Sequence, residues 1–288
     1  MFQQLPHLEY GNVASLFEPL NHLGILTAVL AQHRQGKLFV DNLDTPQTAF
    51  VWSPGVWCFL AGNANNERFN ESLRTALFNQ GISENEVSIW LCVCDSEAWK
   101  PALSSIARPR QLVLVPRLYY RCDTLQMNGW DCLPDGFTAL PVDAELLSRT
   151  DVKLPQDVSN WIAEIGTPAE FFANSFGFVA MHGRDVVSWC MADGIAGLRT
   201  ELGIYTKKEF QQRGLATALT ALAVEYAFSR GLTEVTWQCN VDNTPSIRTA
   251  EKVGFHLIDD YTMLAFLSDA DNHTRWLERL GVEEATAV

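Results

Sequence analysis

The chain has 288 residues, of which 47% are hydrophobic and 19% charged, so it is long enough for two domains with sizeable cores and too apolar for a disordered protein. Its formal net charge of −13 argues against nucleic acids and acidic membrane surfaces as partners. No apolar run reaches the ~18 residues of a membrane span, and the first residues lack the features of a signal peptide. We therefore expect the seven cysteines to be free thiols in a reducing cytoplasm.

Helical and strand periodicities alternate along the first part of the chain. Apolar residues at helical spacing predict a helix over residues 13–33. The elements expected after it are strands at 37–41, 48–52 and 56–60, a helix at 67–79, a strand at 87–93, a helix at 97–107 and a strand at 111–120. The stretch MNGWDCLPDGFTALP then breaks the periodicity with turn residues, which predicts a first domain over residues 1–126 and a linker over residues 127–136.

Residues 137–288 are expected to form a second domain with a similar order of elements. These elements are a strand at 139–143, helices at 143–149 and 156–172, strands at 178–182, 186–192 and 198–206, a helix at 214–230, a strand at 234–240, a helix at 245–253 and a strand at 255–267. A break in the helix at 156–172 is expected near Gly166, and Gly231 should end the helix at 214–230. The chain is then either an internal duplication or two α+β halves whose element order agrees by coincidence.

A strand–turn–helix segment around Gly214 has the features of an anion site. The first N–H groups of the helix have no intrahelical partner and lie at the positive end of the helix dipole. Gly214 and Ala216 have small side chains, so an anion can approach the backbone closely. Residues 201–256 hold six Lys and Arg against six Asp and Glu, so this segment is neutral within an acidic chain. An ordinary tight turn is the alternative.

A second group of residues follows the strand expected at 234–240. Asn243 precedes Pro245, which stands at the expected start of a short helix, and Gly254 would end that helix. Two parallel strands that are joined by a helix and splayed at their carboxyl ends would leave a slot for a ligand. The turn at Gly214 would lie on one side of this slot and Asn243 on the other.

Patterns of other catalytic classes are missing from the sequence. The six histidines are scattered, and no HExxH, GxSxG or P-loop pattern occurs. No set of Cys and His pairs stands at the spacing of zinc ligands. We therefore expect no metal site and no serine hydrolase or nucleoside triphosphatase.

Together, the two segments resemble the GNAT N-acetyltransferase superfamily. QQRGLA at residues 211–216 fits the signature Q/R-x-x-G-x-G/A, and NTPSIRTAEKVGF at residues 243–255 fits N-x-x-A…YEKxGF with Ser in place of Ala. The resemblance covers residues 137–267, and more loosely the whole chain looks like a bacterial subgroup with an extra N-terminal half. It implies an α+β or α/β fold, a mixed and mostly antiparallel sheet flanked by helices, in two tandem halves of which the first is a degenerate copy that binds no CoA.

The resemblance implies transfer of an acetyl group from acetyl-CoA to a small-molecule or peptide amine. The backbone of Ile204 and Thr206 would pair with the pantetheine arm, and Asn243 would hold the pantetheine or the reacting region. The residues implied in binding the diphosphate are Gln211, Gln212, Arg213, Gly214, Leu215, Ala216 and Thr217. A homodimer is compatible with this assignment.

Glu201 and Tyr205 are the candidate catalytic residues. Glu201 shares a strand face with Tyr205 and is the first choice for the base that makes the amine neutral; a strand glutamate that is solvated or paired with Arg199 is the alternative. A backbone N–H near Tyr205 would polarise the thioester carbonyl. Ala250 stands where the family has an acidic Tyr, so Tyr205 or Tyr261 replaces it or the thiolate leaves unprotonated. This departure keeps open a second hypothesis, a non-catalytic acyl-CoA-binding or regulatory protein with the same fold.

Overall fold

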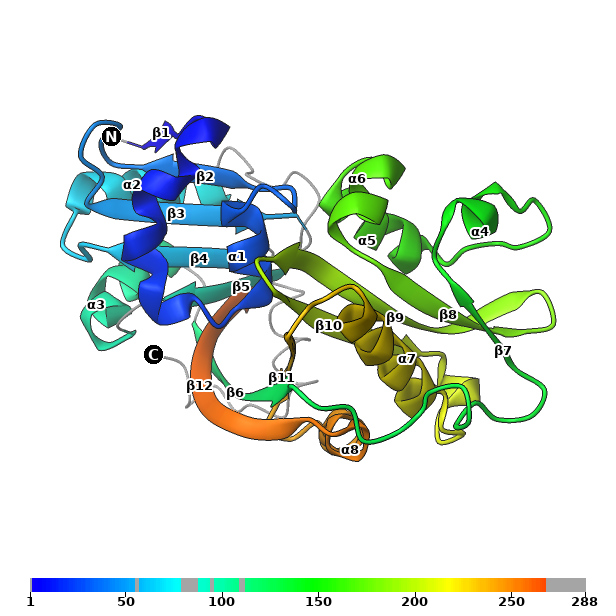
Figure 1. Ribbon diagram of the computed structural model, residues 1–288. Coiled ribbons are helices and arrows are strands. Elements are labelled where there is room, and N and C mark those ends of the chain that lie inside the picture. The colour runs from blue at the N-terminus through cyan, green and yellow to red at the C-terminus, as the bar shows by residue number, and fades with distance from the viewer. Residues whose placement is uncertain (1, 55–56, 79–87, 94–95, 109–111, 268–288) are drawn as a thin grey trace. The chain divides into compact units, whose positions relative to one another are not determined.

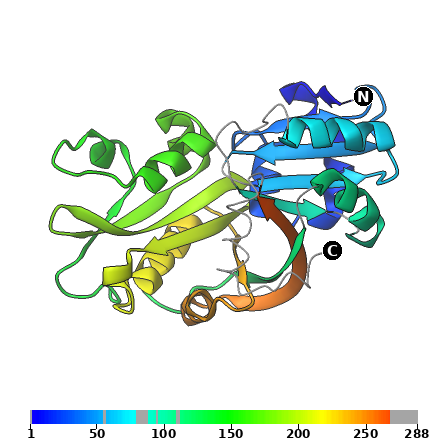
Figure 2. The ribbon, with the colours of Figure 1, turned by 180° about the vertical axis from the view of Figure 1, so that it is seen from behind.

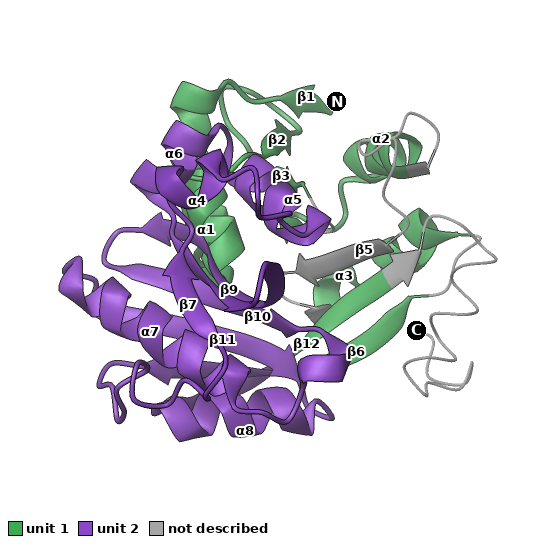
Figure 3. Ribbon diagram, turned by 90° about the vertical axis from the view of Figure 1, so that its right-hand side faces the viewer, with its two compact units in different colours: residues 1–116, 262–288 green, residues 117–261 purple. Residues whose placement is uncertain are grey.

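The computed structural model describes residues 2–54, 57–78, 88–93, 96–108 and 112–267 (Figure 1). The chain forms two compact units, one of residues 1–116 with 262–288 and one of residues 117–261 (Figure 3). The limits between the units fall within the strands β6 (Val113–Cys122) and β12 (His256–Leu267). No helix in these described ranges is both long and apolar enough to cross a membrane.

The first unit is a sheet with helices on both faces. Its strands lie in the order β1 (Gln3–Gln4), β2 (Lys37–Val40), β3 (Thr48–Ser53), β4 (Trp57–Gly62), β5 (Ser88–Val93) and the end of β12. β4 and β5 are parallel, and the other pairs are antiparallel. The helices are η1 (His7–Leu20), α1 (Gly24–Leu30), α2 (Glu67–Phe78) and α3 (Ser96–Ala107). η1 and α1 pack on one face, and Figure 2 shows α2 and α3 on the opposite face.

The prediction of a single helix over residues 13–33 is wrong. Residues His7–Leu20 form the 3₁₀-helix η1, and a separate α-helix begins at Gly24. Pro19 lies inside η1, where it has no N–H to donate and its ring excludes regular α-helical geometry one turn earlier. The apolar spacing still marks the inner face, because Val13 and Phe17 are fully buried.

The second unit repeats this arrangement around a longer sheet. Its strands lie in the order β6, β11 (Glu234–Asn240), β10 (Arg199–Thr206), β9 (Asp185–Ala196), β8 (Gly177–His182) and β7 (Thr138–Pro141). β10 and β11 are parallel, and the other pairs are antiparallel. The helices are α4 (Ala144–Ser148), α5 (Gln156–Ile165), α6 (Pro168–Asn174), η2 (Lys208–Phe210), α7 (Leu215–Ser229) and α8 (Thr244–Val253). The expected break at Gly166 separates α5 from α6, and α7 ends just before Gly231, as predicted.

Both units carry three antiparallel strands, a helix, a parallel strand and a helix, in this order. The strand that follows each series in the chain pairs with a strand of the other series. β6 follows α3 in the chain, but its residues 117–122 pair with β11 in the second unit. β12 follows α8, but its residues 264–267 pair with β5 in the first unit. The mixed, mostly antiparallel fold in two tandem halves is therefore confirmed.

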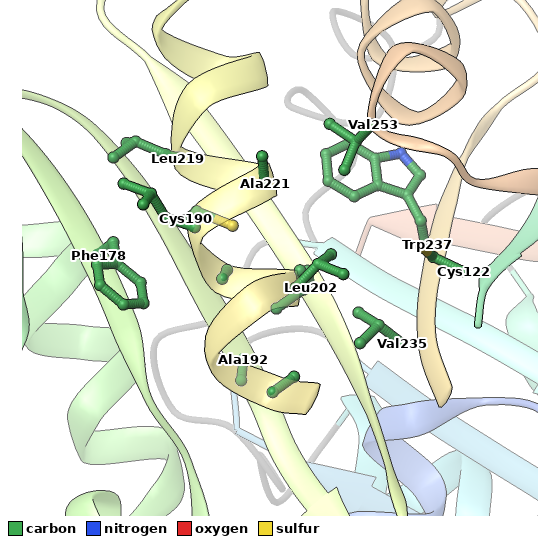
Figure 4. Packing of buried hydrophobic residues seen from close by; sticks show 14 of the residues in the cluster. Cys122, Phe178, Cys190, Ala192, Leu202, Leu219, Ala221, Val235, Trp237 and Val253 are labelled. Carbon is green, nitrogen blue, oxygen red and sulfur yellow. The ribbon is translucent and has the colours of Figure 1, made fainter. Parts of the chain in front are cut away.

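Side-chain alternation along β8 and β9 divides the core of the second unit into two layers. Phe178 and Cys190 pack under α7 (Figure 4), whereas Val179 and Trp189 pack against α5 and α6. β9 is therefore buried on both faces, which explains its continuous apolar sequence. α7 is apolar almost all round for a similar reason, since the sheet covers one side and α8 lies against another.

The segment expected to be a linker, residues 127–136, packs against the second unit. Met127 and Leu133 contact the core under α7, and the N–H of Gln126 donates to the carbonyl of Val253 at 3.3 Å. The domain limits expected from the sequence, 1–126 and 137–288, stay a prediction.

Candidate active site

The parallel strands β10 and β11 separate toward their carboxyl ends. Their pairing is confined to residues 199–201 and 234–236, whereas β10 continues along β9 as far as Thr206. The N–H of Lys207 donates to the carbonyl of Val187 on β9 at 2.9 Å. Because successive residues of a strand direct their backbone groups to opposite sides, the groups of Ile204 and Thr206 face away from β9, into the gap.

The N-terminus of α7 opens beside this gap. Gly214, with φ of +86°, is the cap residue, and no side chain caps this helix in the described structure. The first amide bonded within the helix is that of Ala218, to the carbonyl of Gly214 at 3.0 Å. The amides of residues 215–217 therefore point out of the helix end, where the dipole is positive. Such a helix mouth binds anions.

A cavity of about 800 Å³ joins the strand gap to the mouth of α7. Its walls come from the end of β10, the turn before α7, the first turn of α7, and α8 from its first turn to its last. The lining residues are Ile204, Tyr205, Thr206, Phe210, Gln211, Gln212, Gly214, Leu215, Ala216, Thr217, Asn243, Thr244, Pro245, Ser246, Arg248, Thr249 and Lys252. Two cationic side chains and no carboxylate are among these described residues, so the cavity suits an anion.

The cavity brings together nearly all the residues that the sequence suggested for the cofactor. All of them except Arg213 line it. The guanidinium of Arg213 lies 5.4 Å from the ring centre of Phe210 and donates to the carbonyl of Glu209 at 3.3 Å. Arg213 can therefore contribute its backbone, while its side chain is held against Phe210 and does not line the cavity.

Asn243 has a structural role as well as a place in the cavity wall. Its Oδ1 accepts the N–H of Ser246 at 3.2 Å and so caps α8. Pro245 stands in the first turn of that helix, as its sequence position predicted, and Gly254 ends the helix in a left-handed conformation.

Tyr205 lies at the end of β10 where the cavity begins. Its ring stacks on Trp189 at 4.7 Å between ring centres, and about half of its surface is exposed. On the same strand face, Gly203 leaves room for Trp161, because a Cβ at Gly203 would lie 2.2 Å from the Trp161 ring. The Trp161 N–H donates to the carbonyl of Ala192 at 3.0 Å, which holds the ring in place.

Glu201 is buried and does not line the cavity. Only 6% of its surface is exposed, and its Oε2 accepts a 2.6 Å hydrogen bond from Nε2 of Gln238 on β11. Its burial contradicts a solvated strand glutamate, whereas the other alternative, a pair with Arg199, stays open. The hydroxyl of Tyr261 on β12 donates to Oε1 of Gln238, so Tyr261 is joined to Glu201 through one amide.

Ala250 and Cys239 provide no reacting group. Ala250 is fully buried in α8, and its methyl group packs in the core beneath α7. Burial is the main cause that raises the pKa of the Cys239 thiol, which favours the neutral, unreactive form. Both Trp189 and Trp237 are at least 97% buried and belong to the core.

Sequence reasoning missed the contribution of α8 to the cavity beyond Asn243. Arg248 and Lys252 are four residues apart, so they lie one turn apart on one face of the helix, and both reach the cavity. This i,i+4 spacing of two cations on the helix that follows Asn243 was the signal that could have found them.

The first unit differs from the second at the corresponding helix start and strand ends. Oδ1 of Asn66 accepts the N–H of Phe69 at 3.2 Å and so caps the start of α2, the counterpart of α7. The parallel strands β4 and β5 stay paired through Leu60 and Val93, the last residue of β5. Within the described ranges, no group of three or more His, Cys, Asp or Glu side chains could hold a metal ion.

Comparison with known proteins agrees with this geometry. The family model for GNAT acetyltransferase matches residues 14–264. The uncharacterized N-acetyltransferase YdfB of Bacillus subtilis (strain 168) is 22% identical over 263 residues, which cover 91% of this chain and 98% of that protein. 

Two solved structures share the fold. A GCN5-related N-acetyltransferase-like protein from Streptococcus suis 89/1591 matches with a TM-score of 0.69 and 20% identity over 89% of this chain and 98% of that one. A tandem GNAT protein from the clavulanic acid biosynthesis pathway matches with a TM-score of 0.56 and 12% identity over 93% of this chain and 98% of that one. Since the family model spans nearly the whole chain, the protein belongs to the GNAT acetyltransferase family and is an acyltransferase.

Proposed function

We propose that the protein transfers an acetyl group from acetyl-CoA to a primary amine by direct attack within a ternary complex. The observation that carries this proposal is the cavity between the open mouth of α7 and the separated ends of β10 and β11. The amides of residues 215–217 would bind the diphosphate. The backbone of Ile204 and Thr206 would bind the pantetheine arm as an added strand.

The transfer needs one base and one polarising group. The amine nitrogen attacks the thioester carbonyl, its proton passes by way of water to Glu201, which lies outside the cavity lining, and the C–S bond breaks with its electron pair on sulfur. The backbone N–H near Tyr205 would stabilise the charge on the carbonyl oxygen. Since Ala250 supplies no acid, the thiolate takes its proton from water; a thiol pKa near 8.5 makes it a tolerable leaving group.

The acceptor is a small molecule or a peptide that carries an amine. Glu201 is a buried acid on the strand face shared with Tyr205, which suits an acceptor that arrives as a cation and must lose a proton. The cytoplasmic location and a homodimer stay predictions of the sequence.

Isothermal titration with acetyl-CoA tests the binding half of the proposal. Gly214→Glu should weaken binding by about tenfold or more, because its carboxylate would occupy the positive helix end. A Cβ at Gly214 would meet only Pro134, at 3.9 Å, so the variant adds backbone strain and charge without a clash. Gly231→Glu is the matched control, because Gly231 has a φ of +83° and lies at the opposite end of α7. Equal affinity of Gly214→Glu and the wild type would refute the assignment.

Release of free CoA in the presence of a panel of primary amines tests the catalytic half. Glu201→Gln should slow release without weakening the binding of acetyl-CoA. If acetyl-CoA binds and no amine releases CoA, the chain is an acyl-CoA-binding protein that keeps the fold, which is the alternative that Ala250 left open.

A further inference from the structure

The side chains of Glu201, Gln238 and Tyr261 form a directed series of hydrogen bonds. Tyr261 donates its hydroxyl proton to Oε1 of Gln238, and Nε2 of Gln238 donates to Oε2 of Glu201 at 2.6 Å. We propose that Gln238 is a positioning residue for Glu201 and that Tyr261 sets the orientation of its amide. This inference rests on the proposed role of Glu201 as the base.

The direction of the Gln238 amide matters because the two ends of an amide differ. Its nitrogen only donates hydrogen bonds, and its oxygen only accepts them. A phenol hydroxyl donates readily to the oxygen, so Tyr261 favours the orientation in which the nitrogen faces Glu201. The reversed amide would place its oxygen against a carboxylate, where two acceptors repel each other. Tyr261 therefore selects the arrangement that stabilises an ionised Glu201.

Because Glu201 is buried, the orientation of the Gln238 amide affects the ionisation of its carboxyl group. A carboxylate that is 6% exposed loses most of its hydration, and a hydrogen bond from a neutral amide compensates for part of that loss. Bonds to a charged group are worth about 1.5–3 kcal/mol, which corresponds to roughly tenfold to a hundredfold in an ionisation constant. Gln238 thus contributes to how much of Glu201 is ionised, and able to take a proton, at neutral pH.

Other ionisable groups surround the pair. Tyr119 on β6 lies among Glu234, Arg199, Glu201 and Arg121, which all act on its ionisation. Burial is the main cause that raises the pKa of Tyr119, so its hydroxyl stays protonated; it lies 3.5 Å from Oε1 of Glu234. β9, which pairs with β10, carries the buried Asp193. Gln238 is the uncharged member of this group in direct contact with Glu201, so its replacement changes a hydrogen bond without changing the net charge.

The experiment is an NMR titration of the full chain labelled with ¹³C in the glutamate side chains. The Glu201 signal is assigned by its loss in Glu201→Gln. In Gln238→Met, which keeps the side-chain length and removes the amide, the titration midpoint of Glu201 should rise by about one to two pH units. Tyr261→Phe, which removes one hydroxyl and keeps the ring, should raise it by less. Gln156→Met is the matched control, because Gln156 lies on the exposed surface of α5 and bonds only Asn160 there among the described contacts.

The pH dependence of CoA release provides a second measurement. In Gln238→Met the rate at neutral pH should fall and recover as the pH is raised, because the base then ionises at a higher pH. An unchanged Glu201 midpoint in Gln238→Met overturns the inference, and so does an equal rise in Gln156→Met. If the wild type fails to bind acetyl-CoA in the calorimeter, the proposed function fails, while the titration still decides the role of Gln238.

Discussion

The indole N–H of Trp237 on β11 donates a 3.0 Å hydrogen bond to Oγ of Ser246 in the first turn of α8. Trp237 is 1% exposed, and Ser246 lines the cavity, so this bond ties the core of the second unit to the cavity wall. The family segment has Ala at the position of Ser246. The serine of this chain therefore supplies an acceptor that the buried indole of this chain needs.

Ser246→Ala should destabilise the protein, because it leaves the Trp237 N–H buried without its partner. The expected loss is about 1–3 kcal/mol of unfolding free energy, measured by urea denaturation. Ser229→Ala is the control, since the Ser229 hydroxyl is exposed and bonds a carbonyl at the end of α7. If Ser246→Ala is as stable as Ser229→Ala, the hydrogen bond between Trp237 and Ser246 does not contribute to the free energy of unfolding.

Gly203→Ala should disturb the aromatic cluster beside the strand gap. The new methyl group would lie 2.2 Å from the Trp161 ring, so the ring must move away from β10. Overpacking of this kind costs about 1–3 kcal/mol. Urea denaturation should show this loss, and calorimetry should show nearly unchanged binding of acetyl-CoA. Combining Gly203→Ala with Trp161→Ala should cost less than the sum of the two single changes; simple additivity would show that the two residues do not interact.

Much of the second unit could be predicted because its signals are local. Gly214 is the residue type that tolerates a φ of +86°, and the break at Gly166 and the capping position of Asn243 depend on neighbours within a few residues. Of these positions, Gly214 and Asn243 line the cavity. The residues expected at the diphosphate are consecutive in sequence, so one correctly placed turn brings them together.

The features that could not be predicted depend on distant parts of the chain. β6 and β12 have the sequence of ordinary strands, and nothing local tells whether β5 or β11 is the strand with which each one pairs. The same holds for Glu201, whose spacing placed it on the face of Tyr205, whereas its bond to Gln238 depends on the pairing of β11 beside it. The 3₁₀-helix η1 differs from the expected α-helix because Pro19 interrupts α-helical geometry, although the apolar spacing is typical of a helix.

Arg248 and Lys252 should contribute to cofactor affinity through their charge. Both line the cavity that opens at the mouth of α7, so either change to Ala would remove one positive charge near a bound polyanion. Exposed charges of this kind are worth about 0.4–1 kcal/mol at the upper end of their range, so each change should weaken acetyl-CoA binding roughly twofold to fivefold and reduce its dependence on salt. Arg184→Ala, an exposed cation that does not line the cavity, is the control. Equal affinities for all three variants at low salt would place the cofactor elsewhere.

The buried thiols of Cys122 and Cys190 should make the protein less stable at alkaline pH. Burial raises the pKa of Cys122 to about 11 and that of Cys190 to about 12. In the unfolded chain both thiols ionise near pH 8.5–9, whereas the folded protein keeps them protonated, so the unfolded state binds fewer protons and stability falls as the pH rises. Between pH 7.5 and 10 the expected loss is about 1.5 kcal/mol for each thiol, measured by urea denaturation at both values. Cys122→Ala and Cys190→Ala should each reduce this loss, and Cys132→Ala, at a partly exposed position, is the control. A pH-dependent loss that is the same in all three variants as in the wild type would assign it to other groups.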